Sequence, residues 1–342
     1  MSNSTWHNAL QKAKNSPKNE LYTRIEDIEK MFSYFPSGLF EGKTILCPCD
    51  GPASKFIEYI ASHWEELKPK QLLAVWYSPS IQGHYMRMTD PDCLQQWIPL
   101  VGHGDFRDEE TKPLWQEADF VITNPPFSPM HDFVAQLYAM NKQFCIVAHM
   151  MVSLYQRVFP KIYTGEVKVL LAVNNMYFNT PSGKKFEIGN GCWLSNMPTS
   201  YKAPEYHIKR TMKENEELGY KYRKYDNYDN VLEISHLKYL PTDYDGVMGV
   251  PITFFNWDYS EYKVLGSSTG REEYDVFPTK KYGPMNFFTH DKDGNRIVKL
   301  RGGANSDALV EVDKDFSGNY YQELNSDKKL ISVFRRVFIQ KK

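Results

Sequence analysis

The sequence lacks the features of a membrane-embedded or secreted protein. No stretch approaches the roughly 18 consecutive apolar residues that a membrane-spanning helix needs. Residues 1–19 are polar, carry three lysines and contain no apolar segment of the kind found in signal peptides. We therefore expect a cytoplasmic protein that does not contact a membrane.

Cysteine is scarce and odd in number, which argues against a fold held together by disulfides. The five cysteines are Cys47, Cys49, Cys93, Cys145 and Cys192, and most lie in apolar surroundings. Reduced thiols in a cytoplasmic protein are the expectation for such a set. Because Cys47 and Cys49 form a C-x-C pair with no second ligand pair nearby, we expect no metal site.

Positive charge is not in surplus. The chain has 41 lysines and arginines against 42 acidic residues, a formal net charge of −1. This balance excludes a generally basic protein that coats nucleic acid. It does not exclude an enzyme with a local basic face, because exposed charges act over about 10 Å at moderate salt. Basic residues gather between 209 and 224, where a solvated helix face is the alternative interpretation.

Short apolar runs alternate with longer amphipathic stretches through the first part of the chain. The runs predict seven strands, at Thr44–Cys47, Leu72–Trp76, Leu100–His103, Phe120–Thr123, Phe144–Ala148, Val167–Val173 and Cys192–Asn196. The stretches predict helices at Ile25–Phe35, Lys55–Leu67, Met130–Met140 and Leu154–Ile162. Strands alternating with helices favour an α/β fold with a doubly wound, mostly parallel sheet.

The character of the sequence changes after Asn196. Tyrosine, lysine and asparagine become dense, as in 220–230, and the apolar runs at 247–255 and 332–339 are short. Turn signals such as Asp-Gly and Gly-Gly recur. We therefore predict two parts: a domain over 1–196, and a mixed α+β lobe over 197–342 that is rich in loops and antiparallel strands.

The most informative segment is Ala118–Ser128, which reads ADFVITNPPFS. An apolar strand ends at Asn124, and two prolines then fix the backbone and prevent the ladder from continuing. Polar groups are thus held at the carboxyl edge of a sheet, where open α/β folds bind their ligands. The Asn124 amide oxygen, the Pro125 carbonyl and the flat face of Phe127 suit a planar group that carries an amino function. The alternative interpretation is a stiff turn and nothing more.

Two other turns have the chemistry of a ligand site. The first strand leads into Cys47–Phe56, where small residues let a ligand approach the backbone and the start of a helix. The third strand leads into Gly104-Asp105-Phe106, where a carboxylate can accept from an adenine amino group while a ring stacks on the base. A plain strand-to-helix turn and a helix-capping Asp105 are the respective alternatives.

Taken in order, these segments resemble an adenine-specific DNA methyltransferase of the EcoRI type. Asn124-Pro125-Pro126-Phe127 resembles the NPPF signature of amino-methyltransferases, and Asn19–Thr23 is similar to their N-terminal cofactor element. The resemblance extends to the late segments 225–229 and 241–254 and covers about residues 8 to 265. It implies a seven-stranded Rossmann-like methyltransferase sheet, S-adenosylmethionine as the cofactor, double-stranded DNA as the partner and N6 of a flipped-out adenine as the target.

The resemblance also implies roles for single residues. Asn124, Pro125, Pro126 and Phe127 become the catalytic set. The cofactor-binding residues become Tyr22, Thr23, Cys47, Asp50, Gly51, Asp105, Phe106 and Asn124, with Asp50 accepting from the amino-acid end of the cofactor. Without the resemblance, Thr23 would be a helix cap that forms a capping box with Glu26.

Two departures from the family pattern affect the cofactor site. The second strand ends Ala74-Val75-Trp76-Tyr77, without the acidic residue that commonly holds the ribose hydroxyls. Trp76 or Tyr77 is expected to pack on the adenine instead. The first loop holds a single glycine, Gly51, in place of a full G-x-G.

The lobe after Asn196 is expected to read the DNA sequence. Residues 220–230 interleave basic side chains with tyrosines and amides, groups that contact phosphates and base edges. The candidates there are Lys221, Arg223, Lys224, Tyr225 and Asn227, and further basic candidates are Lys184, Lys185, Arg271, Lys280, Lys281, Arg296 and Arg301. Any cognate restriction endonuclease would be a genetic rather than a physical partner, and the sequence does not show whether one exists.

Two other functions fit parts of the pattern. Methylation of RNA or of a protein amide would use the same NPPF chemistry, although an RNA enzyme would more often carry a basic surplus or an added RNA-binding module. A catalytically silent DNA-binding protein of the same fold is the third hypothesis, and binding of S-adenosylmethionine distinguishes it from an enzyme. The recognised DNA site cannot be deduced from the sequence.

Overall fold

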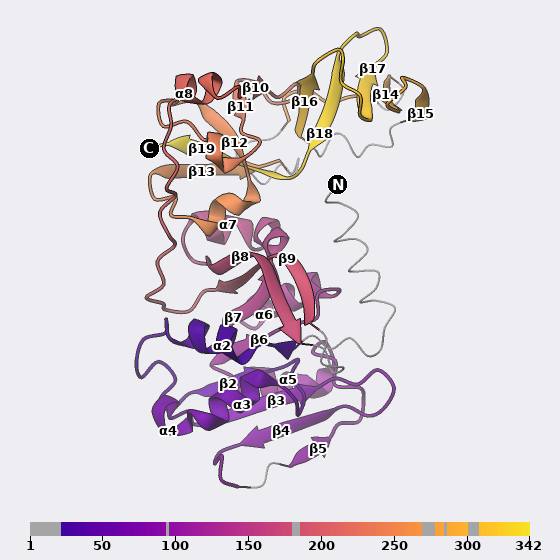
Figure 1. Ribbon diagram of the computed structural model, residues 1–342. Helices are drawn as coiled ribbons and strands as arrows, with labels where there is room; N and C mark the ends of the chain where they lie inside the picture. Colours follow the sequence, from indigo (N-terminus) through magenta and orange to yellow (C-terminus); the bar gives the residue numbers. More distant parts are fainter. Residues whose placement is uncertain (1–21, 94–95, 180–184, 269–277, 284–285, 300–307) are drawn as a thin grey trace. The chain divides into compact units, whose positions relative to one another are not determined.

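The computed structural model describes residues 22–93, 96–179, 185–268, 278–283, 286–299 and 308–342. The chain divides into two compact units between Ala203 and Pro204. Each unit has its own sheets, coloured from indigo to magenta in the first unit and from salmon to yellow in the second (Figure 1).

The first unit is built on one sheet of nine strands. Their order across the sheet is β1-β8-β9-β7-β6-β2-β3-β4-β5. The strands are β1 (Tyr22–Thr23), β2 (Thr44–Cys47), β3 (Gln71–Trp76), β4 (His84–Met88), β5 (Trp97–Pro99), β6 (Phe120–Thr123), β7 (Gln143–His149), β8 (Lys168–Asn179) and β9 (Lys185–Ser195). The pairs β7–β6, β6–β2 and β2–β3 are parallel, whereas the other five pairs are antiparallel. The predicted parallel arrangement therefore describes the centre of a larger mixed sheet.

The predicted strand Leu100–His103 is wrong. Val101 is 95% exposed, and the backbone amides of Val101 and Gly102 donate to the carboxylate of Glu110 instead of to a neighbouring strand. The edge of the sheet is formed upstream by the β4–β5 pair, which the sequence analysis missed. Only Met86 and Met88 of β4 are buried, so the strand has little apolar signal.

Helices cover both faces of the sheet, as expected for a doubly wound α/β fold (Figure 1). The helices are α2 (Ile25–Phe32), α3 (Lys55–Ser62), α4 (Trp64–Leu67), α5 (Lys112–Glu117), α6 (Met130–Ala139) and α7 (Phe159–Tyr163), with the 3-10 turns η1 (Glu109–Thr111) and η2 (Met150–Leu154). Helices α2 and α3 pack on one face in a common core with Ile45 and Ile122. Successive side chains along a strand point to opposite faces of the sheet. On the face opposite to α2 and α3, the ring of Phe144 on β7 packs edge-on against Tyr138 of α6.

Three predicted helices end or begin elsewhere. The stretch Lys55–Leu67 is two helices, separated at His63 by a non-helical backbone. The first predicted helix stops at Phe32, three residues short of Phe35. Most of Leu154–Ile162 is not helical, because α7 begins only at Phe159, with Pro160 in its first turn, where a missing amide hydrogen is tolerated.

The second unit contains two five-stranded sheets. The first has the order β10 (Arg223–Lys224), β11 (Val231–Glu233), β12 (Val247–Pro251), β19 (Arg336–Lys341) and β13 (Tyr262–Ser267). The second has the order β15 (Arg296–Lys299), β14 (Phe287–His290), β17 (Tyr320–Glu323), β18 (Lys329–Val333) and β16 (Ala308–Val312). Only β11–β12 pair in parallel among these strands. The helices are α8 (Met212–Glu217) and the 3-10 turns η3 (Leu237–Tyr239) and η4 (Ile252–Asn256).

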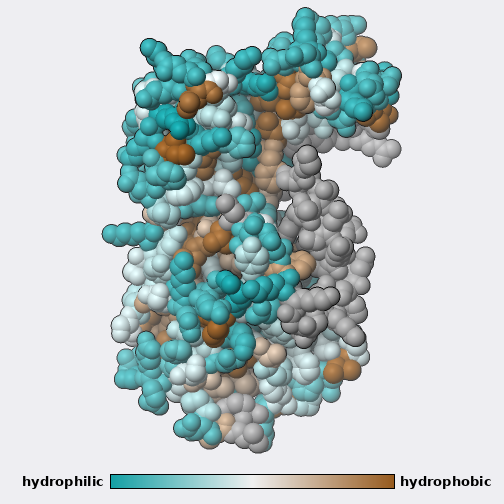
Figure 2. Space-filling view, in the orientation of Figure 1, coloured by the Kyte–Doolittle hydropathy of each residue, from teal (hydrophilic) through white to brown (hydrophobic). Residues whose placement is uncertain are grey.

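The face of the molecule in Figure 2 is mostly hydrophilic, with separate hydrophobic patches. Within the part of the chain that the structure describes, no helix has the length and apolar character to cross a membrane.

Candidate functional site

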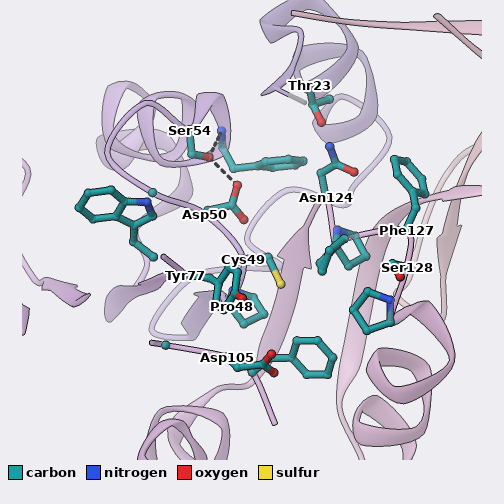
Figure 3. Close-up of a pocket in the computed structure, with 18 of the residues that line it drawn as sticks. Thr23, Pro48, Cys49, Asp50, Ser54, Tyr77, Asp105, Asn124, Phe127 and Ser128 are labelled. Atoms are coloured by element: carbon teal, nitrogen blue, oxygen red, sulfur yellow. Dashed lines mark hydrogen bonds between the residues drawn. The ribbon is translucent and has the colours of Figure 1, made fainter. Parts of the chain in front are cut away.

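A cavity of about 600 Å³ opens at the carboxyl ends of β2, β3 and β6 (Figure 3). This volume is in the range of sites for nucleotide-sized ligands. The three turns singled out in the sequence meet here, contributing Asp50 and Gly51, Asp105 and Phe106, and Asn124 to Phe127. Tyr22 and Thr23 of β1 complete the wall. Cys47 does not line the cavity, because it is fully buried in β2, and Pro48 and Cys49 face the space instead.

Asp50 is a buried carboxylate held by two hydroxyl groups. Its Oδ1 accepts a hydrogen bond of 2.7 Å from Ser54 Oγ, and its Oδ2 accepts one from Thr123 Oγ1. Only 7% of Asp50 is exposed. Burial disfavours the charged form and raises the pKa of Asp50 to about 6, while the Thr123 and Ser54 hydrogen bonds act in the opposite direction. These two partners of the Asp50 carboxylate are neutral hydroxyl groups, so a ligand cation in the cavity could pair with its negative charge.

Gly51 lies against an indole ring. A Cβ atom at this position would stand 2.7 Å from Cδ1 of Trp76. The ring of Trp76 stacks on His84 and meets Trp97 edge-on, so it has little room to withdraw. The single glycine of the first loop therefore allows Trp76 to line the cavity.

Asp105 is engaged by Arg107, an arginine for which no role was predicted. Arg107 forms a two-pronged ion pair with Asp105, through Nε at 2.8 Å and Nη2 at 2.7 Å, and its Nη1 reaches Asp132 of α6 at 3.0 Å. These contacts hold the pKa of Asp105 below its usual value. The backbone amide of Arg107 also donates to Asp105 Oδ1, so Asp105 closes a turn and caps no helix.

Thr23 is part of a strand and caps no helix. The N-cap residue of α2 is Arg24, without a side-chain capping bond, and β1 pairs Thr23 with Phe178 of β8. The Thr23 side chain is 3% exposed, and its Oγ1 has no hydrogen-bond partner among the described residues. Figure 3 shows this hydroxyl and the Asn124 side chain pointing toward one another at the cavity. A buried hydroxyl without a partner indicates a place for a ligand.

The Asn124–Phe127 motif directly follows β6 and lines the cavity. Asn124 is half-buried, Pro125 is buried and Pro126 is exposed. Phe127 is partly buried against the main core, and its ring meets Phe178 edge-on with centroids 6.3 Å apart. The residue just before the motif, Thr123, is fully buried and donates to Asp50. The motif and the first loop are thus joined by a hydrogen bond.

Sequence reasoning missed Thr123, Ser54, Arg107 and Asp132. Signals existed for the first three, because each lies inside or next to a segment that was singled out. Asp132 carried no signal, since it reaches the site only through the fold of α6.

Tyr225 and Asn227, predicted to contact DNA, are buried in the second unit and do not form a surface. The Tyr225 hydroxyl bonds to Glu233, whose carboxylate forms a buried ion pair of 2.7 Å with Arg336. Asn227 is fully buried, and its Oδ1 accepts from the backbone amide of Leu309. Both side chains are needed for packing, so the structure does not support a direct role in base contact.

Lys221, Arg223 and Lys224 remain available on the surface. Lys221 and Lys224 are exposed, and Arg223 lies 3.6 Å from Asp313 in a solvent-exposed pair. Lys280, by contrast, is engaged by Asp226 at 2.9 Å and Glu323 at 2.7 Å. Lys281, Lys185 and Arg296 are exposed. Lys184, Arg271 and Arg301 lie outside the described residues.

Cysteine chemistry and metal binding are not indicated at the site. Burial raises the pKa of the Cys49 thiol well above its usual value, which keeps the sulfur neutral. None of the five cysteines, all of which lie in the described part of the chain, forms a disulfide. Among the residues that the structure describes, no group of three or more His, Cys, Asp or Glu side chains is placed to hold a metal ion.

Comparison with known proteins finds one family over almost the whole chain. The family described as "Adenine-specific methyltransferase EcoRI" matches residues 9–342. Type II methyltransferase M.EcoRI of Escherichia coli is 30% identical over 313 residues, which cover 81% of this chain and 94% of that protein. Type II methyltransferase M.MpnI of Mycoplasma pneumoniae is 31% identical over 270 residues, covering 73% and 82%.

A third relative, Type II methyltransferase M.MgeORF184P of Mycoplasma genitalium, is 30% identical over 264 residues, covering 72% of this chain and 81% of that protein. Among solved structures, YeaZ from Pseudomonas aeruginosa covers 40% of this chain at 15% identity. Its TM-score of 0.16 is too low to indicate a shared fold.

Proposed function

This chain belongs to the EcoRI family of adenine-specific methyltransferases, and from that premise we propose that it moves a methyl group from S-adenosylmethionine to N6 of adenine in double-stranded DNA. The family resemblance predicted from the motifs is confirmed. The observation that carries the proposal is that the Asn124–Phe127 motif and the Asp50 loop line one cavity.

The residues of the cavity fit the cofactor at each of its ends. The buried Asp50 carboxylate suits the ammonium group, and the buried Thr23 hydroxyl is a donor without a partner among the described residues, suited to the carboxylate. Asp105 and the neighbouring Phe106 ring suit the adenine, as an acceptor for its amino group and an apolar contact. When bound, S-adenosylmethionine supplies an electrophilic methyl group on a sulfonium sulfur.

Asn124 and Pro125 orient the accepting nitrogen. The lone pair of an adenine N6 is delocalised into the ring, so the amino group is a weak nucleophile. The Asn124 amide oxygen and the Pro125 carbonyl accept its two hydrogens and favour a pyramidal nitrogen. Such positioning contributes about 7–11 kcal/mol to well-oriented reactions. The displaced N6 proton leaves to solvent after transfer, so the motif needs no separate general base.

The target adenine must leave the helix to reach the cavity. Extruding a base costs a few kcal/mol, because pairing and stacking are lost. Phe127 offers a flat ring beside Asn124 and recovers part of that cost, since stacking of a base on an aromatic ring is worth about 1–3 kcal/mol. The edge-on contact with Phe178 restricts the orientation of the Phe127 ring.

The first unit, with the cavity, forms the catalytic domain, and the lobe after Asn196 recognises the DNA. Its basic cluster, here called the basic strand segment, consists of the exposed Lys221 and Lys224 and the partly exposed Arg223. Such side chains bind phosphates and position the protein on the duplex. The enzyme acts on DNA in the bacterial cytoplasm, and any restriction endonuclease with the same recognition site would be a genetic rather than a physical partner.

Reversing charge in the basic strand segment should weaken DNA binding and reduce its dependence on salt. Each phosphate contact that is lost lowers the slope of log K against log salt by about 0.9. The double variant Lys221→Glu, Arg223→Glu is therefore expected to have a slope smaller by about 2. Fluorescence anisotropy over a salt series measures it.

A matched control carries the same change of net charge elsewhere in the same unit. Lys292 and Lys314 are exposed and lie outside the basic region between 209 and 224, and their double replacement by glutamate should leave the slope close to that of the wild type. Equal slopes for both double variants would exclude the basic strand segment from the DNA interface.

The function itself is tested by methylation-aware sequencing of DNA from cells that express the protein. N6-methyladenine is expected at one recurring sequence context and absent from cells without the gene. Methylation of cytosine, or unmodified DNA with methyl groups recovered in RNA or protein, would contradict the proposal. The same data give the recognition site, which neither the sequence nor the structure provides.

A further inference from the structure

The link between Asp50 and Thr123 joins the cofactor loop to the catalytic motif. Strands β2 and β6 are parallel neighbours, with Leu46 opposite Val121. Their carboxyl ends therefore lie side by side, although Asp50 and Thr123 are 73 positions apart in the chain. Thr123 is fully buried and immediately precedes Asn124. One buried hydrogen bond thus connects the two halves of the site.

Ser54 holds the opposite side of the same carboxylate. Its Oγ donates to Asp50 Oδ1 and accepts at 3.1 Å from the backbone amide of Phe56, at the start of α3. Each oxygen of Asp50 therefore receives one hydroxyl hydrogen and keeps a lone pair for a further donor. The plane of the carboxylate is fixed by β6 on one side and by α3 on the other.

We propose that Thr123 is a positioning residue, which holds Asp50 ready for the ammonium group of the cofactor and thereby sets the lowest pH at which the cofactor binds. This inference rests on the proposed function. The ammonium group requires an ionised Asp50, whereas burial favours its neutral form. The Thr123 and Ser54 hydrogen bonds oppose that effect, and the Thr123 bond is the larger of the two.

The cysteines and the ion pair nearest to Asp50 do not change charge over the same range. Burial raises the pKa of the Cys47 and Cys49 thiols well above their usual value, so both stay neutral. The Asp105–Arg107 pair stays charged, because each partner favours the ionised form of the other. The remaining ionisable side chains of the cavity wall are Tyr22, Lys55, Tyr77 and Asp132, and among them Lys55 is paired with Glu58 and Asp132 with Arg107.

The sign of the effect follows from linkage. The free protein has an Asp50 pKa of about 6, above the usual value of 3.8. Below pH 6 the carboxyl group is protonated and must lose its proton before the ammonium binds, so affinity falls by up to tenfold per pH unit. Loss of the Thr123 hydroxyl raises the pKa of Asp50 further, and the fall then begins at a higher pH.

Two ligands separate this effect from damage to the cavity. S-adenosylhomocysteine carries the ammonium group, and 5′-methylthioadenosine has the same nucleoside and sulfur without the amino-acid end. Isothermal titration between pH 5 and pH 7 measures the affinity of both ligands for the wild type and for Thr123→Val. This variant keeps the side-chain shape without the hydroxyl. Thr123→Ser, which keeps the hydroxyl, is the matched control.

We expect the wild type and Thr123→Ser to lose S-adenosylhomocysteine affinity below about pH 6, while 5′-methylthioadenosine binding stays level. Thr123→Val should show the loss at higher pH, with at least threefold weaker S-adenosylhomocysteine binding at pH 6.5 and unchanged 5′-methylthioadenosine binding. Should Thr123→Val not unfold cooperatively in a thermal melt, Thr123→Ala provides the same comparison.

Three results would overturn the inference. The first is a pH profile of Thr123→Val that coincides with the wild type. The second is an equal loss of both ligands at every pH, which would indicate a collapsed cavity. The third is a wild type whose S-adenosylhomocysteine affinity does not change between pH 5 and pH 7. A wild type that binds neither ligand would instead remove the proposed function.

Discussion

Replacing Asn124 with alanine is expected to abolish methyl transfer, with a loss of at least 1,000-fold in kcat. The reason is that alanine has no acceptor for the N6 hydrogens, so the amino group stays flat and its lone pair stays in the ring. Removing one preorganised hydrogen-bonding group from an active site costs about 10²–10³-fold. Asn124 also fixes the direction of attack, which adds to that loss. Transfer of a tritiated methyl group to DNA measures the rate.

The matched control is Asn124→Asp. An aspartate keeps an acceptor oxygen at the same distance from the backbone. We therefore expect Asn124→Asp to retain more activity than Asn124→Ala. Both variants should bind S-adenosylhomocysteine within a few-fold of the wild type, because Asp50, Thr23 and Asp105 are unchanged. Near-normal turnover by Asn124→Ala would remove Asn124 from the mechanism.

The strands that position the site were predictable from sequence because they are buried on both faces. β2 and β6 lie at the predicted limits, and their side chains are all buried, which produces a continuous apolar run with a sharp end. β4 and β5 are short; only Met86 and Met88 of β4 are buried, and β5 has no buried residue. β4 pairs with β3 and β5, its neighbours along the chain, but neither β4 nor β5 has the continuous apolar run that marks the central strands, so the local pattern gave no reliable signal.

The second unit shows the opposite limit of sequence reasoning. Tyrosine and asparagine between 220 and 230 indicated a polar surface, yet Tyr225, Asn227 and Tyr228 are buried. Tyr228 and Phe338 pack with ring centroids 4.7 Å apart, and Asn227 satisfies a backbone amide of β16. Amphipathic side chains can fill a core when their polar atoms find partners. The Tyr225 hydroxyl finds its partner nearby, in Glu233. The amide bonded to Asn227 lies in β16, 82 positions later, and the ring packed on Tyr228 lies in β19, so composition could not reveal these contacts.

Asp50→Asn should separate cofactor binding from stability. The amide has nearly the same shape as the carboxylate but no charge, so the ammonium group loses its counter-ion. Hydrogen bonds to charged groups contribute about 1.5–3 kcal/mol, which corresponds to roughly 10- to 100-fold weaker S-adenosylhomocysteine binding at pH 7. Isothermal titration measures this loss. Glu58→Gln, an exposed charge removal on α3, should leave the affinity within twofold of the wild type.

Without ligand, Asp50→Asn should raise the stability of the protein at pH 7, although the same change weakens cofactor binding. The folded-state pKa of Asp50 is about 6, raised from 3.8, so its contribution to stability is fully present below pH 3.8 and is lost as pH rises through 6. Asparagine does not ionise, so the variant does not lose stability as the pH rises through 6. Asp50→Asn is therefore expected to match the wild type near pH 4 and to exceed it at pH 7, by at most about 3 kcal/mol in the free energy of unfolding.

Denaturant unfolding at the two pH values, without ligand, measures this difference. A purely structural Asp50, whose hydrogen bonds to Ser54 and Thr123 stabilise the loop, predicts that Asp50→Asn is less stable at pH 7 and binds the cofactor poorly for that reason. A carboxylate kept buried for the cofactor predicts weaker binding together with a more stable protein. The sign of the stability change at pH 7 therefore decides between the two roles.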